Sequence, residues 1–171
     1  MAANMKALFI GRFQPFHKGH LRVVQEASKK YDEVIIGIGS SQYSDTSDNP
    51  FTSEERELMI KKTLEKSVIN NYRIISIPDI HNPPKWVDHV LPIVSDFDVV
   101  ISNNSLTKRL FSEKGYNVKE TPLYEKKKYS GREIRRRMIN SEPWDDLVPT
   151  EVSNFIKDIG GVNRVKELSN K

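Results

Sequence analysis

The chain has 171 residues, of which 37% are hydrophobic and 29% are charged, which is enough apolar material for the core of one compact domain. It contains no cysteine, which excludes disulfide bonds, thiolate catalysis and a cysteine-ligated zinc site. The 27 basic and 23 acidic residues leave a net charge of +4, and this mixed surface suits small phosphorylated ligands better than nucleic acid.

The sequence favours a cytoplasmic location without a membrane partner. No apolar stretch approaches the length of about 18 residues that a membrane-spanning helix needs. Residues 1–4 lack the basic and apolar regions of a signal peptide. The absence of cysteine also fits a reducing compartment. We therefore expect a soluble cytoplasmic protein.

Strand-like runs of β-branched residues alternate with helical patterns along most of the chain. Strands are predicted at 6–10, 33–38, 73–77, 98–102 and 116–119, and helices around 21–27, 52–64, 86–94 and 106–115. The helical pattern around 86–94 crosses Pro92, which predicts a kink or two short pieces. This alternation implies right-handed βαβ crossovers and a parallel sheet covered on both faces. The predicted fold class is α/β, a Rossmann-like doubly wound parallel sheet that binds ligands at the carboxyl ends of its strands.

The strand signals stop at Ser130, and helical patterns follow. They cover 130–140, roughly 143–158, and 162–168 after Gly160-Gly161. We expect one domain over 1–171, with a sheet core of about 5–125 and a C-terminal helical cap of about 130–171. Lys126, Lys127 and Lys128 form a charge run that predicts a solvated loop.

The first predicted strand runs into the stretch GRFQPFHKGH, residues 11–20, which opens the next helix. Glycines let the backbone approach a ligand, and the amides at a helix start attract anions. His17 and His20 are three positions apart, which turns both imidazoles the same way and allows them to hold one phosphate. Two alternatives are a pair of polar surface histidines and a zinc pair, although the HExxH glutamate and an obvious third ligand are missing.

A second motif begins at Ser130. Ser130 and Glu133 fit a capping box, S-x-x-E, which explains both residues by helix initiation alone. Arg132, Arg135 and Arg136 recur at spacings of three and four, so they are predicted to share one helical face. Like charges stacked in this way cost about 0.2–0.5 kcal/mol per pair, so a bound polyanion would be a reason to keep them. The next residue along, Arg137, is expected to be solvated.

Together these stretches resemble the archaeal nicotinamide-mononucleotide adenylyltransferases of the HxGH nucleotidyltransferase superfamily. The resemblance spans nearly the whole chain, and it rests on GRFQPFHKGH at 11–20, IGIGSSQ at 36–42, NPFTSEER at 49–56, PDI at 78–80 with Trp86 downstream, and YSGREIRRRM at 129–138. It implies a sheet of the nucleotidyltransferase type. It also implies a homo-oligomer, with a hexamer as the expected size.

The resemblance implies a reaction in which the phosphate of nicotinamide mononucleotide attacks the α-phosphate of ATP, giving NAD and pyrophosphate. The acceptor phosphate has a second pKa near about 6 and is mostly dianionic at neutral pH, so no strong general base and no covalent intermediate are expected. The site must then align two anions and neutralise the charge of the transition state. Mg²⁺ would arrive on the ATP phosphates with few or no protein ligands, so no metal-binding residue is assigned.

By the same resemblance, His17, His20 and Arg135 are the catalytic residues. Arg12 would contact the triphosphate or the leaving group. The other ATP-binding candidates lie in the matching stretches: Gly11, Phe13, Gln14, Gly19, Gly39, Ser40, Asn104, Ser130 and Arg132.

The nicotinamide side is assigned to Asp79, Asn82 and Trp86. A flat cationic pyridinium suits an indole face, although a core position for Trp86 remains an alternative. His81 and His89 have no role in this assignment and are expected to be structural or surface residues.

The chain departs from the family pattern at several positions. Arg132 stands where a threonine is usual, Asp48 where a basic residue is expected, and Asn103 where a glycine is expected. Pro83 takes the place of an asparagine, and Asn82 lies one position earlier. Except for Arg132, which touches the ATP motif, these departures bear on the identity of the substrate more than on the class of reaction.

Two rival functions follow from the same residues. One is an adenylyltransferase for another phosphate, such as flavin mononucleotide or phosphopantetheine. The other is a nucleotide sensor or RNA-binding protein that kept the fold without turnover. The intact pair His17 and His20 argues against the second rival. The leading prediction is therefore an enzyme of NAD biosynthesis that acts on nicotinamide mononucleotide, with the nicotinic-acid form of this nucleotide left open as a second acceptor.

Overall fold

The computed structural model describes residues 2–122 and 126–171. Contacts divide the chain into two compact units that interleave along the sequence. The sheet unit comprises the described residues of Met1–Gly11, Val23–Ser41 and Asn71–Pro122. The helical unit comprises those of Arg12–Arg22, Gln42–Asn70 and Leu123–Lys171. The expectation of one domain over 1–171 stays a prediction.

The sheet unit is built on five parallel strands in the order β3-β2-β1-β4-β5. The strands are β1 (Ala2–Gly11), β2 (Tyr31–Gly39), β3 (Tyr72–Ile77), β4 (Val99–Ile101) and β5 (Asn117–Lys119). The chain runs outward from β1 to β3 and then crosses back to add β4 and β5 beside the other edge of β1. The predicted doubly wound, Rossmann-like sheet is confirmed, and its topological switch point lies between β1 and β4.

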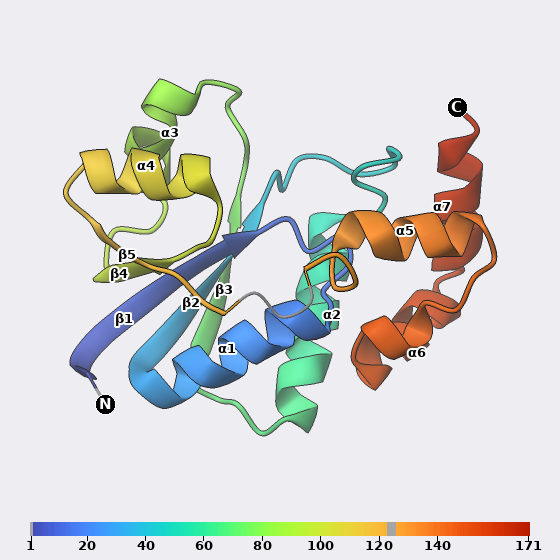
Figure 1. The fold of residues 1–171 in the computed structure, drawn as a ribbon, viewed down its shortest axis with the longest axis horizontal. Coiled ribbons are helices and arrows are strands. Elements are labelled where there is room, and N and C mark those ends of the chain that lie inside the picture. Colours follow the sequence, from blue (N-terminus) through green and yellow to red (C-terminus); the bar gives the residue numbers. More distant parts are fainter. Residues whose placement is uncertain (1, 123–125) are drawn as a thin grey trace. The chain divides into compact units, whose positions relative to one another are not determined.

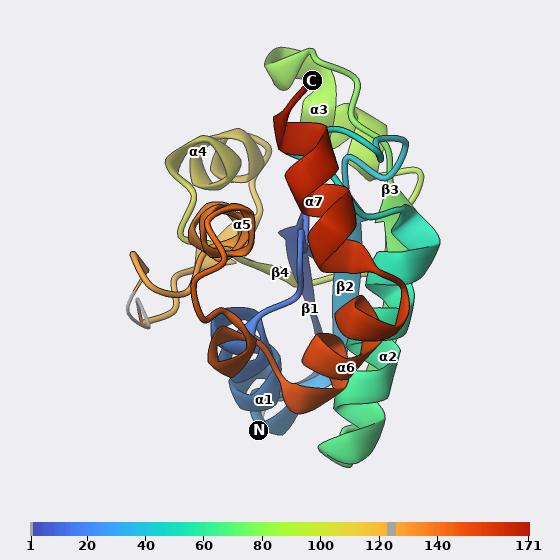
Figure 2. The same cartoon turned by 90° about the vertical axis from the view of Figure 1, so that its right-hand side faces the viewer.

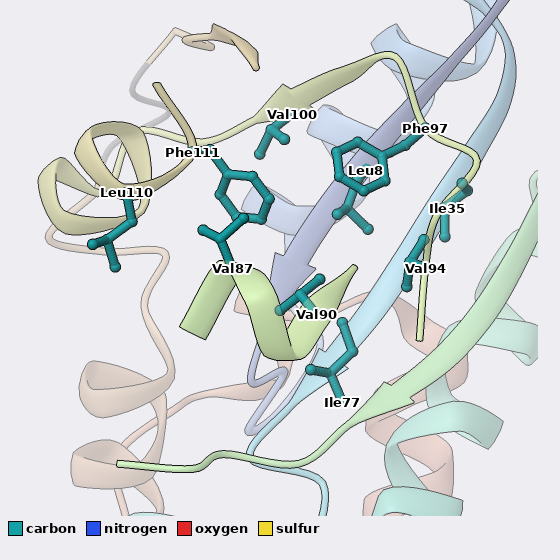
Figure 3. Close-up of a cluster of buried hydrophobic side chains, with 10 residues drawn as sticks. All are labelled: Leu8, Ile35, Ile77, Val87, Val90, Val94, Phe97, Val100, Leu110 and Phe111. Carbon is teal, nitrogen blue, oxygen red and sulfur yellow. The ribbon is translucent and has the colours of Figure 1, made fainter. Parts of the chain in front are cut away.

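One face of the sheet carries a cluster of buried apolar side chains (Figure 3). Leu8 on β1 pairs with Ile35 on β2 and with Val100 on β4, so these three side chains form the floor of the cluster. The other members come from β3, from α3 (Pro83–Val90) and the segment after it, and from α4 (Ser105–Glu113): Ile77, Val87, Val90, Val94, Phe97, Leu110 and Phe111.

The opposite face of the sheet is buried as well. Alternate residues of a strand point to opposite faces, and Ala7, Val34 and Ile36 are fully buried on the second one. Figure 1 shows α1 (Lys18–Lys30) on this side of the sheet, away from α3 and α4. Burial on both faces explains why the strands read as continuous apolar runs rather than alternating ones.

The helical unit contains four α-helices and a short 3-10 helix among the described residues (Figure 2), besides the first turn of α1. They are α2 (Ser53–Lys66), α5 (Gly131–Ile139), η1 (Asp145–Leu147), α6 (Thr150–Asp158) and α7 (Gly161–Ser169). α2 starts with a complete capping box, in which Thr52 Oγ1 accepts from the Glu55 N–H and the Glu55 carboxylate accepts from the Thr52 N–H. The predicted helix start at Thr52 is therefore confirmed.

Two helix predictions differ from the structure. The pattern across Pro92 is one helix, α3, which ends at Val90 before the proline, and the chain then turns. The prediction of a single helix at 143–158 is wrong, because Val148 and Pro149 have extended backbones and separate η1 from α6. The proline is the physical reason, since it disfavours a helical conformation in the residue before it.

The lysine run at 126–128 lies in a turn, with Lys126 and Lys127 exposed, as the sequence predicted. Among the described helices, none combines the length and the apolar character that crossing a membrane would require.

Candidate active site

The motif stretch leaves β1 at Gly11 and enters α1 at Lys18, and its aromatic residues form a small buried core of their own. Phe13 and Phe16 are almost completely buried, with ring centroids 5.7 Å apart. Both contact His20, Phe13 edge-on at 4.8 Å and Phe16 stacked at 5.6 Å between ring centroids. The two phenylalanines therefore fix the orientation of this imidazole.

His17 and His20 are locked to each other by reciprocal hydrogen bonds. The backbone N–H of His17 donates to His20 Nδ1 at 3.1 Å, and the backbone N–H of His20 donates to His17 Nδ1 at 3.3 Å. The two rings stack with centroids 3.5 Å apart and planes 19° from parallel. Because each Nδ1 accepts a hydrogen bond, the proton of each neutral imidazole lies on Nε2. Both rings therefore present an Nε2–H donor.

Both histidines are neutral at physiological pH. Burial lowers the pKa of His17 to about 3. Burial also lowers the pKa of His20 well below its usual value, and the charge of nearby His17 adds to this. Two positive charges on rings 3.5 Å apart would repel each other strongly, which agrees with this direction. The alternative of ordinary surface histidines is wrong, since only 6% of His17 is exposed.

Gly19 is required by the histidine pair. A Cβ atom at this position would lie 2.9 Å from His17 Cε1 and 3.2 Å from Tyr129 Cβ, which is closer than carbon atoms pack. The sequence pattern attributes the glycine to close approach of a ligand. The contact it permits in this structure is with the His17 ring and Tyr129.

Arg135 extends from α5 toward the motif stretch. Its Nη1 donates to the Gln14 carbonyl oxygen at 2.7 Å, and its Nη2 lies 4.0 Å from Asp48 Oδ1. Burial, followed by the charge of Arg12, lowers the pKa of Arg135 to about 10, so the guanidinium stays charged at neutral pH. A charged group that is only 6% exposed is a strong local source of positive potential.

The start of α5 only partly matches its prediction. Ser130 Oγ accepts from the Glu133 N–H at 3.1 Å, which is one half of the predicted capping box. The Glu133 carboxylate instead binds Arg136 and Arg137, and Arg136 also pairs with Glu142. The placement of Arg136 on an anion-binding face is therefore wrong, and so is the expectation that Arg137 is merely solvated. Both guanidinium groups are engaged within their own helix and the turn after it.

The other two arginines of this region differ in exposure. The Arg12 side chain is exposed, and its guanidinium contributes to lowering the pKa of Arg135. Arg132 is also exposed and acts on Arg135 in the same direction, more weakly. Arg12, Arg132 and Arg135 thus concentrate positive charge within the helical unit, and Asp48 is a carboxylate that faces it.

Sequence reasoning missed the role of Arg56, which is fully buried. Its guanidinium donates to the backbone carbonyl oxygens of Arg12 at 3.0 Å, Thr52 at 3.1 Å and Tyr43 at 3.2 Å. Burial and the charge of Arg12 lower its pKa to about 10, so it also stays charged. The available signal was its spacing, because Arg56 shares the buried helical face of Met59, Ile60 and Thr63.

Gln14 does not present its side chain as a ligand contact would require. Only 2% of the residue is exposed. Its Oε1 accepts from the Phe51 N–H at 2.9 Å, and its Nε2 donates to the Phe51 carbonyl oxygen at 3.0 Å. Gln14 therefore joins the motif stretch to the segment that precedes α2.

The remaining ATP-binding candidates lie in the sheet unit, after the carboxyl ends of neighbouring strands. Gly11 and Gly39 end β1 and β2, and Ser40 follows with a positive φ of 48°. Asn104 caps α4 by accepting from the Thr107 N–H at 3.0 Å. Asn103, at the position where the family has glycine, brackets the backbone of Thr121 through two hydrogen bonds of 2.8 Å. This bracket ties the chain after β4 to the chain after β5.

The nicotinamide-side candidates lie in the segment between β3 and α3. Asp79 Oδ1 accepts from the His81 N–H at 2.9 Å, and Asn82 is exposed at the start of α3 without capping it. Trp86 is half-buried and meets Phe111 edge-on at 5.4 Å, so it packs partly against the sheet-unit core. The alternative of a core position for Trp86 is therefore partly confirmed.

The two histidines outside the motif behave as expected. His89 Nε2 contacts the Pro78 carbonyl oxygen at 2.8 Å, which is a structural role, and His81 is exposed.

The predicted site residues thus form two groups. The helical unit contains the imidazole pair and Gln14, Ser130, Arg12, Arg132 and Arg135. The sheet unit holds Gly11, Gly39, Ser40, Asn104, Asp79, Asn82 and Trp86. Within residues 2–122 and 126–171, no three histidine or acidic side chains are placed to hold a metal ion. The first group offers hydrogen-bond donors and fixed positive charge, which is a donor set for phosphate oxygens.

Residues 8–137 match a family model described as cytidylyltransferase-like. The chain is 50% identical over 167 residues to a nicotinamide-nucleotide adenylyltransferase of Methanococcus aeolicus, covering 98% of this chain and 96% of that protein. It is 48% identical over 164 residues to the enzyme of the same name from Thermoplasma acidophilum, covering 96% of this chain and 92% of that protein.

A solved structure from Francisella tularensis has the same fold, with a TM-score of 0.79 and 26% sequence identity over 96% of this chain. That protein is a bifunctional NMN adenylyltransferase/ADP ribose pyrophosphatase complexed with AMP and a manganese ion, and this chain spans about half of it, 51%. The resemblance noted in the sequence is confirmed by these similarities. The chain belongs to the nicotinamide-nucleotide adenylyltransferase family, whose members are nucleotidyltransferases.

Proposed function

We propose that this protein transfers the AMP moiety of ATP to nicotinamide mononucleotide, producing NAD and pyrophosphate. The observation that carries the proposal is the stacked pair His17 and His20, whose Nδ1 atoms are occupied and whose Nε2–H groups are donors. Phosphate oxygens that carry no proton are acceptors, so two N–H donors on stacked rings are a matched recognition element. Identity of about 50% to enzymes named for this reaction supports the same assignment.

The reaction is an in-line displacement at phosphorus. A phosphate oxygen of the acceptor forms a bond to the α-phosphorus of ATP, and the bond from that phosphorus to the bridging oxygen of pyrophosphate breaks. The acceptor phosphate is already mostly dianionic, so no side chain has to remove a proton. His17 and His20 donate to the phosphate in transfer, while Arg135 and Arg12 neutralise charge on the departing pyrophosphate.

Neutral imidazoles suit this task. Their Nε2–H groups can bind a phosphate without first taking up a proton, and the binding stays unchanged across the physiological pH range. The permanent charge comes from Arg135, whose pKa of about 10 keeps it protonated. The site thereby separates hydrogen bonding from charge neutralisation.

A divalent cation, Mg²⁺ in our proposal, is expected to enter with the ATP phosphates. The donor set of the helical unit consists of imidazoles and guanidiniums, which fits a cation carried by the phosphates more than one held by the chain. When bound, the cation would neutralise phosphate oxygens and orient the triphosphate. No step is assigned to it beyond that.

The acceptor assignment rests on Trp86, Asp79 and Asn82. The half-buried Trp86 indole offers an aromatic face for the cationic pyridinium of nicotinamide. Asp79 and Asn82 would bind the amide or ribose groups. Pro83 departs from the family in this segment and Asn103 departs after β4. We expect the two departures to tune the choice between the nicotinamide and nicotinic-acid forms.

Further parts of the proposal concern ATP and the assembly. Around the triphosphate and adenosine we place the remaining motif residues: Gly11, Phe13, Gly19, Gly39, Ser40, Asn104, Ser130 and Arg132. We also propose that the chain works as a single domain in a cytoplasmic homo-oligomer, expected to be a hexamer, with no nucleic-acid or membrane partner.

Product analysis tests the proposal directly. The purified protein is incubated with ATP, Mg²⁺ and one acceptor at a time: nicotinamide mononucleotide, nicotinic acid mononucleotide, flavin mononucleotide or phosphopantetheine. We expect pyrophosphate release together with NAD from the first acceptor. Turnover of flavin mononucleotide or phosphopantetheine without turnover of either pyridine nucleotide would reject the proposal, and no turnover with any acceptor would favour the sensor.

A further inference from the structure

Gln14 occupies a junction that the transfer mechanism above does not use. It is 2% exposed, and both polar atoms of its side chain bind the backbone of one residue, Phe51. The amide thereby imitates a neighbouring β-strand, since it satisfies both the N–H and the C=O of its partner. A side chain held in this way fixes the position of its own backbone.

The backbone of Gln14 in turn holds Arg135. Its carbonyl oxygen accepts from Arg135 Nη1 at 2.7 Å, a short charge-assisted bond between buried groups. Space at this contact is tight, because a Cβ on Gly131 would lie 2.8 Å from Arg135 Nη1 and 2.9 Å from the Gln14 oxygen. The glycine is therefore the residue that lets α5 approach the carbonyl.

Phe51, whose backbone binds the Gln14 side chain, is itself held firmly in place. It is fully buried, and the guanidinium of Arg164 on α7 lies 5.8 Å from its ring centroid. Arg164 also binds the Pro50 carbonyl oxygen at 3.3 Å and forms two hydrogen bonds to Glu55, of 2.6 and 2.9 Å. Glu55 is the residue that closes the capping box of α2. The segment at 50–52 is thus pinned by two helices.

We propose that Gln14 is a positioning residue for Arg135. Its side chain is held by the buried backbone of Phe51, and its carbonyl oxygen therefore holds the Arg135 guanidinium in a fixed place. This inference rests on the proposed function and changes the expected role of Gln14 from ATP contact to support. One edge of the Arg135 guanidinium is held by the carbonyl, so the remaining N–H donors keep a constant direction toward the phosphates. Preorganised donors of this kind lose their value when their support becomes loose.

A double-mutant cycle tests the coupling. Gln14→Met keeps the approximate volume of the side chain but removes both hydrogen bonds to Phe51. We expect kcat/KM for ATP to fall about 10- to 100-fold, the size of effect that a misplacement of about 1 Å produces, while KM for nicotinamide mononucleotide changes less than about twofold. In an Arg135→Ala background, Gln14→Met should change kcat/KM for ATP less than about threefold, because its target is gone.

Gln14→Glu gives a second and independent measurement. A protonated glutamic acid can still accept from the Phe51 N–H and donate to its carbonyl oxygen, whereas the carboxylate would repel that oxygen. Burial raises the pKa of such a carboxyl group. The activity of Gln14→Glu relative to the parent protein should therefore recover as the pH is lowered from 8 to 6, on the order of several-fold. If Gln14→Met does not fold, the same cycle is run with Gln14→Glu.

The matched control is Gln25→Met on α1, which should leave both kinetic constants unchanged. Equal losses from Gln14→Met in the parent and in the Arg135→Ala background would overturn the inference, as would a flat relative pH profile for Gln14→Glu. If the parent protein makes no dinucleotide, the proposed function fails by itself. The inference is then judged by the affinity of the same four proteins for Mg·ATP, measured by calorimetry, where additive losses would reject it.

Discussion

The motif stretch at 12–20 and the segment at 79–86 differ sharply in how they are held. In the first, His17 and Gln14 are nearly fully buried, and every ring has a defined neighbour. In the second, residues 80–85 are exposed, and Asn82 makes no capping bond at the helix start. The part that would handle the phosphates is rigid before any ligand arrives, while the part that would choose the acceptor base is open to solvent.

This difference matches two separate tasks, charge neutralisation by the buried stretch and ring recognition by the exposed segment. Charge neutralisation gains most from groups that are fixed in advance, because they need no reorganisation in the transition state. Recognition of a pyridine ring can use an exposed segment that adjusts to its ligand. The family departures agree with this division in part, since Pro83 lies in the open segment, whereas the sequence of the imidazole pair and its glycine is intact.

The largest effect is expected from the rigid stretch. His17→Ala removes one Nε2–H donor and should lower kcat about 10²- to 10³-fold, the usual cost of losing one transition-state donor. Steady-state kinetics with ATP and nicotinamide mononucleotide would measure it. Lys29→Ala, an exposed change on α1, the helix that follows His17, is the control. A rate within twofold of the parent would remove the histidine pair from the mechanism.

The second prediction concerns the buried support of the same stretch. Arg56→Met removes the guanidinium donors from the carbonyl oxygens of Arg12 and Tyr43, while the Thr52 oxygen keeps its bond from the backbone N–H of residue 56. We expect the free energy of unfolding to fall by about 3 kcal/mol, since an unsatisfied buried polar group costs about 1–3 kcal/mol. Urea denaturation would measure this loss.

The control for Arg56→Met is Arg109→Met on α4, where the arginine is exposed and contacts Glu113 at 3.7 Å. That change should cost less than about 1 kcal/mol. If both variants lost the same free energy of unfolding, the buried Arg56 guanidinium would stabilise the protein no more than an exposed arginine does.

The third prediction is a pH dependence of stability. The pKa of His17 is about 3 in the folded chain and near its ordinary value of 6.5 when unfolded, so the unfolded state binds the proton more readily. Its contribution is therefore fully present above about pH 6.5 and is lost as the pH falls from there toward 3. The slope for one group approaches about 1.4 kcal/mol per pH unit.

Urea unfolding of the parent and of His17→Gln between pH 7 and 5 would test this slope. The parent should lose more stability than the variant over this range, where carboxylates contribute least. If the free energy of unfolding changed equally with pH in both proteins, the His17 imidazole would take up its proton in the folded state. The ring would then be more exposed to solvent than the structure describes.

The smallest effect is expected from the open segment. Trp86→Ala should raise KM for nicotinamide mononucleotide about 3- to 10-fold, the equivalent of a cation–π contact worth about 1 kcal/mol, and leave KM for ATP unchanged. Leu106→Ala, an exposed apolar change, is the control. Equal shifts of both KM values would indicate that Trp86 acts through core packing with Phe111 instead.

Several elements of this protein follow from local sequence patterns. The five strands were predicted within four residues of their ends. For β2 and β4 the reason is that a strand buried on both faces needs an unbroken apolar run. The start of α2 at Thr52 was predicted from hydroxyl and acidic residues in adjacent positions. The break before α6 was missed, although Pro149 was a visible signal. Apolar residues recur every four positions on both sides of the proline, at 144, 148, 152 and 156, so the pattern looks like one continuous helix.

The candidate site could be predicted only as a set of residues. Sequence motifs selected His17, His20 and Arg135, but they assigned Gln14 to a ligand and left Arg56 without a role. Hydrogen bonds that join residues 14 to 51, 56 to 12 and 135 to 14 connect positions far apart in sequence. No local pattern encodes such partners, since a glutamine or arginine has the same propensity whether it meets a phosphate or a carbonyl group.

Periodicity, turn residues and two signature stretches were enough to determine the class of sheet, the family and the chemistry, because these depend on short-range order and on residue type. Tertiary structure alone decided the tautomer and neutrality of the imidazoles, the engagement of Arg136 by Glu133 and Glu142, and the support of Arg135 by a backbone carbonyl. The physical reason is that burial and hydrogen-bond partners set protonation and direction, and both arise only when distant segments pack together.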